Sequence, residues 1–263
     1  MKRLEKEELI GNNQISSSKK FINGLHTPHF HDFYEIEYVV HGGGNCILND
    51  ESIPFTDGML FFVTPVDFHS VQTDGAEIYN IMFSEHLVGF RQLEIFLDQS
   101  APKAFKIAPQ DRQFVEQILA EITANENSKD YSAALMNCLL LKLTKLLPER
   151  KKNHLSDRMS KIRYYIINNY RNKITLETVA SYAGLTPSYV SALFKKEMHM
   201  GLKVYVNTLR LEYAQKLLIY TEQPIKQICE ESGFDDVPNF MKRFKAYYGI
   251  TPSTLRRKQV LQE

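Results

Sequence analysis

Two short segments near the C-terminal end carry hydrogen-bonding and cationic side chains at the spacing of one helix face. The first segment offers Ser188, Tyr189, Ser191, Ala192, Lys195 and Lys196, and the second offers Pro238, Asn239, Met241, Lys242, Arg243 and Lys245. Side chains at the start of such a helix reach base edges in a DNA groove, whereas lysine and arginine bind phosphates. The segments therefore predict contacts to double-stranded DNA; two solvated helix faces are the alternative.

Each segment ends a short pattern that occurs twice, fifty residues apart. The equivalent positions of the two copies are Val179 and Ile228, Gly184 and Gly233, Val190 and Phe240, and Phe194 and Phe244. Apolar side chains at these positions lock two short helices together, and the glycine lets the chain turn sharply between them. One helix-turn-helix pattern is weak evidence for DNA binding, and two in tandem are much stronger evidence.

Helical signals continue through the whole C-terminal part. We expect helices over residues 157–170, 176–182, 189–198, 202–220, 225–231 and 239–247. Thr175 and Thr178 mark the start of the second of these helices. The fourth carries a stripe of Val206, Leu209, Tyr213 and Leu217, which predicts a long helix with one buried face.

Charge divides the chain near residue 150. Residues 151–263 carry 19 Lys and Arg against 10 Asp and Glu, whereas residues 1–150 carry 13 against 21. A basic half attracts phosphate, and an acidic half is repelled by the same polymer. The polar residues 149–156, after Pro148, are the expected linker between the halves.

The N-terminal half has a different periodicity. Strand-like runs at 34–40, 45–48, 59–64 and 78–83 alternate with turn clusters such as Gly42 to Gly44 and Thr73 to Gly75. Regular short strands with regular turns indicate a sandwich or a small barrel. From about Asp111 the period becomes helical, with one predicted stripe at Phe114, Ile118 and Ile122 and a second at Leu135, Leu139, Leu143 and Leu146. The leucine-rich helix is expected either to form a dimer interface or to pack against the barrel.

The C-terminal part resembles the DNA-binding domain of AraC/XylS-type bacterial transcription regulators. The resemblance rests on Ser188 to Glu197, Leu209 to Leu218, Phe240 to Lys245, Gly249 to Ser253 and Arg256. It implies two helix-turn-helix subdomains joined by one long helix, each placing a recognition helix in the major groove. Two departures are His199, where the family often has glycine, and Pro238-Asn239, where many members have Ser-Tyr. His199 is therefore expected to need another cap or a left-handed backbone.

The N-terminal half resembles the cupin barrel that serves as the sensor domain of the same family. Gly24, His29, His31, Glu35 and Gly42 fit its first motif, and Gly58, Pro65 and His69 follow in a short second motif. In cupin enzymes the matching histidines and glutamate hold a metal. In such regulators the barrel more often binds a small molecule without metal, so His29, His31, Glu35 and His69 are candidate ligand-binding residues, with no metal or other cofactor expected. Plain packing is the alternative.

The fold class that follows is α+β and multidomain. The expected divisions are a cupin-like ligand-sensing barrel at 1–108, a helical dimerisation or support region at 109–148, a linker at 149–156 and a tandem helix-turn-helix DNA-binding domain at 157–263. The expected function is a ligand-responsive transcription regulator, by resemblance an activator, without catalytic residues. The alternative is a metal-dependent cupin oxygenase or isomerase with a helical appendage, for which paired basic recognition helices would have no use.

The remaining expectations concern partners and location. Promoter DNA, a small effector of unknown identity, a second copy of the chain and RNA polymerase are the expected partners. A cytoplasmic location without membrane contact is expected because the chain has no leader-like start and no run of eighteen apolar residues. Cys46, Cys138 and Cys229 are expected to be packing residues.

Overall fold

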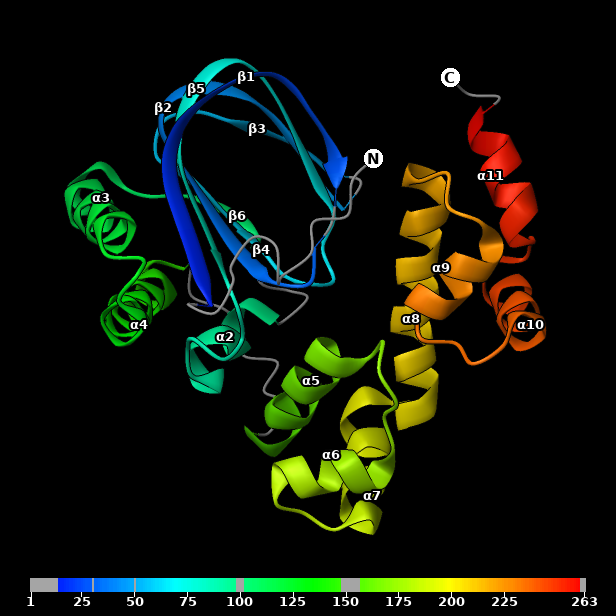
Figure 1. Ribbon diagram of the computed structural model, residues 1–263. Coiled ribbons are helices and arrows are strands. Elements are labelled where there is room, and N and C mark those ends of the chain that lie inside the picture. Colours follow the sequence, from blue (N-terminus) through cyan, green and yellow to red (C-terminus); the bar gives the residue numbers. More distant parts are fainter. Residues whose placement is uncertain (1–13, 30, 50, 98–101, 148–156, 261–263) are drawn as a thin grey trace. The chain divides into compact units, whose positions relative to one another are not determined.

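The computed structural model describes residues 14–29, 31–49, 51–97, 102–147 and 157–260. They form two compact units, one before and one after residues 148–156. The expected linker lies outside the described residues. The first unit combines strands with three helices, and the second is helical (Figure 1).

The first unit is built on an antiparallel sheet that curls on itself (Figure 1). Its strands lie in the order β1-β5-β2-β4-β6, and β3 pairs with β2. The strands are β1 (Ile15–His29), β2 (Tyr34–Leu48), β3 (Glu51–Phe55), β4 (Met59–Val63), β5 (His69–Phe83) and β6 (Ala104–Lys106). This sheet confirms the expected cupin-like domain.

Two predicted turns are bends inside long strands. The predicted runs at 34–40 and 45–48 form one strand, β2, which pairs with β5 on both sides of a register shift at residues 42–44. Gly42 has φ +104°, and a Cβ there would lie 2.3 Å from the Gly75 carbonyl oxygen. Glycine at position 42 therefore allows the bent strands β2 and β5 to approach each other closely. The prediction of turns at 42–44 and 73–75 was wrong.

The first unit also has three helices, α2 (Phe90–Leu97), α3 (Pro109–Ala124) and α4 (Lys129–Leu146), of which α4 packs against α2 and α3. Phe62 of β4 stacks on Phe96 of α2 with ring centroids 4.1 Å apart. The Tyr38 hydroxyl of β2 donates a 2.7 Å hydrogen bond to Glu116 of α3. These contacts join the sheet to two of the helices.

The two apolar stripes predicted for α3 and α4 were only partly right. In α3 the buried residues are Val115, Ile118, Leu119 and Ile122. Phe114 is 42% exposed, so its place in the stripe was wrong. In α4 Leu139 and Leu143 are buried as expected, whereas Leu135 and Leu146 are half-buried. The fully buried side of α4 is shifted toward Met136 and Leu140.

The second unit contains the expected tandem repeat. Its helices are α5 (Asp157–Asn169), α6 (Leu176–Ala183), α7 (Pro187–Met198), α8 (Leu202–Tyr220), α9 (Ile225–Glu231), α10 (Val237–Tyr248) and α11 (Pro252–Val260). The six equivalent apolar positions of the two copies are all 0% exposed: Val179, Val190, Phe194, Ile228, Phe240 and Phe244. Both helix pairs therefore close around the residues that define the repeat.

The helix ends follow the sequence signals. Thr175 and Thr178 form a reciprocal capping box at the start of α6. Gly184 ends that helix in the left-handed conformation with φ +70°, and His199 ends α7 with φ +55°. The expectation that His199 takes a left-handed backbone is therefore confirmed, at a steric cost that glycine would not incur.

The segment after α5 contacts the long helix α8 and the second copy of the repeat. Arg210 of α8 donates hydrogen bonds to the carbonyl oxygens of Tyr170 (2.6 Å) and Asn172 (2.7 Å). Gly233, in the turn of the second copy, approaches so closely that a Cβ would lie 2.4 Å from the Arg171 carbonyl oxygen. Residues 170–172 thus contact two separate parts of the second unit.

Two further expectations can be compared with the described residues. Cys46 and Cys229 are buried, but Cys138 is exposed, so its prediction as a packing residue was wrong. Among the helices of the described ranges, none has the length and apolar character required to cross a membrane.

Candidate functional sites

The first candidate site is the exposed face of α7. Burial of Val190, Leu193 and Phe194 turns the opposite side of the helix to solvent. All six residues predicted for this helix are exposed: Ser188, Tyr189, Ser191, Ala192, Lys195 and Lys196. The face carries three hydroxyl groups near its N-terminal end, those of Ser188, Tyr189 and Ser191, and two lysines in its last turn.

Tyr189 has a partner within the same unit. Its hydroxyl accepts a 2.7 Å hydrogen bond from Arg158 of α5, and the Arg158 guanidinium lies 5.4 Å from the tyrosine ring centroid. The contact fixes the ring and adds a cation beside the face of α7. Arg158 was not among the predicted residues, and no signal within the repeat marks it.

The face of α10 is less open than that of α7. Pro238, Lys242 and Lys245 are exposed, whereas Asn239, Met241 and Arg243 are half-buried. Arg243 Nε donates a 2.8 Å hydrogen bond to Asn239 Oδ1. The amide group that would read a base is thus oriented by a cationic neighbour one helical turn away.

The two faces also differ at their helix caps. The Thr186 hydroxyl accepts a 3.3 Å hydrogen bond from the Tyr189 backbone at the start of α7. At the start of α10 the Asp236 carboxylate accepts a 2.7 Å bond from the Asn239 backbone. A neutral cap and an anionic cap give the two helix starts different electrostatic fields, so the faces are not interchangeable.

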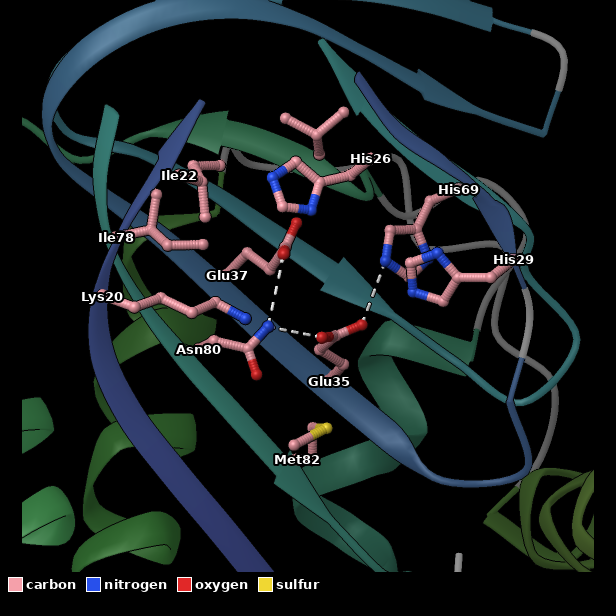
Figure 2. Close-up of a pocket in the computed structure, with 11 residues that line it drawn as sticks. Lys20, Ile22, His26, His29, Glu35, Glu37, His69, Ile78, Asn80 and Met82 are labelled. Carbon is pink, nitrogen blue, oxygen red and sulfur yellow. Dashed lines mark hydrogen bonds and ion pairs between the residues drawn. The ribbon is translucent and has the colours of Figure 1, made fainter. Parts of the chain in front are cut away.

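The second candidate site is a pocket of about 240 Å³ in the sheet of the first unit (Figure 2). Its walls are side chains of β1, β2 and β5, and most of them alternate along their strands because successive side chains point to opposite faces. The lining residues are Lys20, Ile22, His26, His29, Glu35, Glu37, His69, Val71, Ile78, Asn80 and Met82. Lys20 and His26 are exposed, whereas Glu35, His69 and Asn80 are buried.

Glu35 is the most connected side chain of this pocket. Its Oε1 accepts a 2.5 Å hydrogen bond from Asn80, and its Oε2 lies 2.9 Å from His31 Nε2 and 3.1 Å from His69 Nε2. Burial disfavours the carboxylate, but the charge of His69 and the contacts from both histidines hold the pKa of Glu35 well below its usual value. Glu35 is therefore a buried anion.

The neighbouring ionisable groups respond to that anion. Burial, together with the charge of Glu35, raises the pKa of Glu37. Burial works against a charged His69, but the Glu35 carboxylate outweighs it and raises the pKa of His69. Burial and the neighbouring His69 lower the pKa of His29 to about 4, so His29 is neutral near pH 7.

The structure brings three of the four predicted ligand-binding residues together. His29, Glu35 and His69 each place one nitrogen or oxygen atom within 4.8 Å of the others. His31 is buried outside the pocket lining: its Nδ1 lies 2.9 Å from the Phe33 carbonyl oxygen, and its ring stacks on Phe33. It contacts the pocket lining through Glu35 and through an edge-on contact with the ring of His69, with ring centroids 5.4 Å apart.

Four polar lining residues were absent from the prediction. They are Lys20, His26, Glu37 and Asn80. Glu37 follows Glu35 by two residues, which is the signal that could have found it, because such neighbours share a strand face. Lys20 lies on a strand that the sequence did not predict, and Asn80 required the register of β5 against β2, in which it pairs with Glu37.

Known proteins resemble both parts of the chain. Residues 16–144 match the family described as an AraC-like ligand binding domain, and residues 179–258 match the one described as a helix-turn-helix domain. The HTH-type transcriptional activator RhaS of Escherichia coli O81 (strain ED1a) is 25% identical over 260 residues, which cover 94% of this chain and 93% of RhaS.

Two solved structures are also similar. The C-terminal domain of the two-component response regulator yesN from Fusobacterium nucleatum is 34% identical and covers 38% of this chain and 99% of its own, with a TM-score of 0.37. ToxT from Vibrio cholerae O395 is 13% identical and covers 93% of this chain and 98% of its own, with a TM-score of 0.44.

Proposed function

Because this chain belongs to the AraC family of transcription regulators, we propose that it activates transcription by binding promoter DNA through α7 and α10 and responds to a small molecule held in its pocket. The observation that supports DNA binding most directly is the pair of equivalent helices. Each buries the apolar residues of the repeat and exposes a lysine-bearing face. Activation is proposed from the similarity to RhaS.

The two recognition faces are proposed to have different tasks. On α7, Ser188, Ser191 and Ala192 offer short side chains to base edges, with Lys195 at the far end of the face. On α10, Asn239, Met241 and Lys242 offer longer ones. Lys196 and Arg243 are proposed for phosphates, which contribute affinity rather than sequence choice. The two half-sites should therefore differ in sequence.

The pocket is proposed as the effector site. It combines the Glu35 carboxylate and the Asn80 amide in its buried part with Lys20 and His26 at exposed positions. A small polar molecule could satisfy such groups, whereas an apolar one would leave them without partners. Catalysis is not part of the proposal, because an enzyme has no use for two recognition helices.

The helices α3 and α4 are proposed as the dimer contact. Phe114 of α3 is 42% exposed, and Tyr131 and Leu141 of α4 are 44% and 52% exposed. Large apolar side chains on neighbouring helices suit a second copy of the same chain.

RNA polymerase as a further partner and a cytoplasmic location are part of the proposal, as expected of a regulator that acts on promoters.

The test is an electrophoretic mobility shift of promoter fragments from the source genome, with coding fragments of equal length and base composition as the control. We expect a subset of promoter fragments to shift at salt concentrations at which the control fragments do not. Footprinting of a shifted fragment should show two protected segments in successive major-groove turns. Equal binding to all fragments, or binding to none, would overturn the proposal.

A further inference from the structure

We propose that His29, Glu35 and His69 bind a divalent transition-metal ion in the pocket of the first unit. The regulatory role of the metal rests on the proposed function of the pocket as an effector site. The metal site itself is argued from its geometry. It departs from the expectation drawn from the sequence, which favoured a ligand pocket without metal. Figure 2 shows the rings of His29 and His69 side by side, next to the carboxylate of Glu35.

The spacing of the donor atoms fits a metal. Glu35 Oε2 and His69 Nε2 are 3.1 Å apart. Two ligands that each lie about 2.1 Å from a metal, at tetrahedral or octahedral angles, are about 3.0–3.4 Å from each other. The third donor, from His29, lies within 4.8 Å of the other two and belongs to a partly exposed residue at the end of β1. The three donor atoms are therefore close enough together for one ion to lie among them.

The clearest geometric support for the metal site comes from His69. Its residue is only 1% exposed, and within the described residues neither of its ring nitrogens has a hydrogen-bond partner. The 3.1 Å approach to Glu35 is an ion-pair contact without the direction of a hydrogen bond. Buried polar atoms are normally satisfied, and a metal bound to one ring nitrogen would satisfy it.

Contacts with neighbouring groups orient the other two proposed ligands, His29 and Glu35. His29 Nδ1 lies 3.1 Å from the Thr27 carbonyl oxygen, which assigns the proton to Nδ1 and leaves the Nε2 lone pair for a metal. Asn80 holds Oε1 of Glu35, and His31 contacts Oε2. Hydrogen bonds from neighbouring groups to metal-binding histidines and carboxylates are what orient them in known sites.

The donor set indicates the class of metal. Two imidazoles and one carboxylate suit iron, nickel, cobalt, zinc or manganese, whereas calcium and magnesium prefer oxygen ligands alone. Three protein ligands leave coordination positions open. The adjoining cavity of about 240 Å³ provides room for an effector that completes them through its own oxygen atoms. The metal would then be part of the surface that recognises the effector.

The test uses the full-length chain without a histidine tag. The protein is stripped with a chelator, dialysed and titrated with NiCl₂, CoCl₂ and ZnCl₂ by calorimetry, and bound metal is counted by mass spectrometry. We expect one ion per chain. His29→Gln and Glu35→Gln should each weaken binding by about 100-fold or more, whereas His86→Gln, whose side chain is 67% exposed and outside the pocket, should bind like the wild type.

A second measurement needs only the wild-type protein, so it tests the site even if the variants do not fold. The visible absorption of the wild-type protein with CoCl₂ should show bands of cobalt bound by nitrogen and oxygen ligands, and addition of ZnCl₂ should remove them. No bound ion in the wild type, or an equal loss in His86→Gln and His29→Gln, would overturn the metal site. A mobility shift in the same preparations separates the two proposals, since promoter binding without metal would leave the proposed function standing.

Discussion

Arg243 holds Asn239 in place on the face of α10 through a 2.8 Å hydrogen bond from its Nε to the amide oxygen. The arrangement joins a residue proposed for phosphate to one proposed for a base. An asparagine that binds adenine with two hydrogen bonds uses both the oxygen and the nitrogen of its side-chain amide. The contact with Arg243 fixes which way the Asn239 amide points. Affinity and sequence choice are thereby linked in one residue pair.

The first prediction concerns this pair. Arg243→Lys keeps the positive charge but removes the Nε donor, so we expect affinity for scrambled DNA to be retained while affinity for the operator falls about tenfold. Fluorescence anisotropy with both DNAs at several salt concentrations measures the two effects separately. Asn239→Ala should lose a similar discrimination. If Arg243→Lys discriminates as the wild type does, the hydrogen bond has no role in base reading.

The second prediction concerns Lys242, which is exposed on α10. Lys242→Ala should weaken operator binding by about 1–3 kcal/mol and change binding to scrambled DNA less, because a contact to a base edge is lost. The melting temperature should stay the same. Lys226→Ala is the matched control, since Lys226 is an exposed lysine on α9, outside both proposed faces. Equal affinity of Lys242→Ala and wild type would remove Lys242 from the proposed interface.

The third prediction compares two glycines at equivalent turns. Gly184 and Gly233 both have positive φ, at +70° and +82°, but only Gly233 has an atom within 2.4 Å of an added Cβ. Gly184→Ala should therefore lower the free energy of unfolding by about 1 kcal/mol through the backbone alone. Gly233→Ala should cost about 1–3 kcal/mol more, because residues 170–172 must move. Urea denaturation of both variants tests this, and equal losses would contradict it.

The fourth prediction concerns pH. Burial lowers the pKa of His29 from 6.5 to about 4. Between these values the unfolded chain binds the proton and the folded chain does not, so His29 lowers stability as the pH falls from about 6.5 to 4. His29→Gln should flatten this part of the curve, measured by thermal unfolding at each pH. His86→Gln should leave it unchanged; a curve with the wild-type slope in His29→Gln would contradict the assignment.

The second unit could be predicted almost completely because its signals are local. The long helix was expected at 202–220 and is found at Leu202–Tyr220. Helix caps, glycine turns and apolar spacing all act within a few residues, so one sequence is sufficient to find them. Two features were not predicted: helix α11 (Pro252–Val260), and the contacts of Arg210 with Tyr170 and Asn172, which span about forty positions. No local pattern marks such a contact.

The first unit was harder to predict because β1 reverses the usual pattern. Phe21 and Leu25 are 72% and 62% exposed, whereas Lys20 and His26 line the pocket. Strand prediction assumes apolar residues inside and polar residues outside, so this strand was missed. The motif found His29, Glu35 and His69, but the remaining polar lining required the strand register, which one sequence does not contain.

The contacts of residues 170–172 also bear on the spacing of the DNA sites. An inserted base pair between two half-sites rotates one of them about the DNA axis by about 34–36° relative to the other. A protein with a flexible joint between its reading helices would follow that rotation. Here the single helix α8 packs against α7 of the first copy and against α9 and α10 of the second. Arg210 and Gly233 also fasten α8 and the second copy to residues 170–172. We therefore expect the second unit to be sensitive to the helical phase of DNA, so that an operator whose two halves are shifted out of phase is a poor site even when every base is correct.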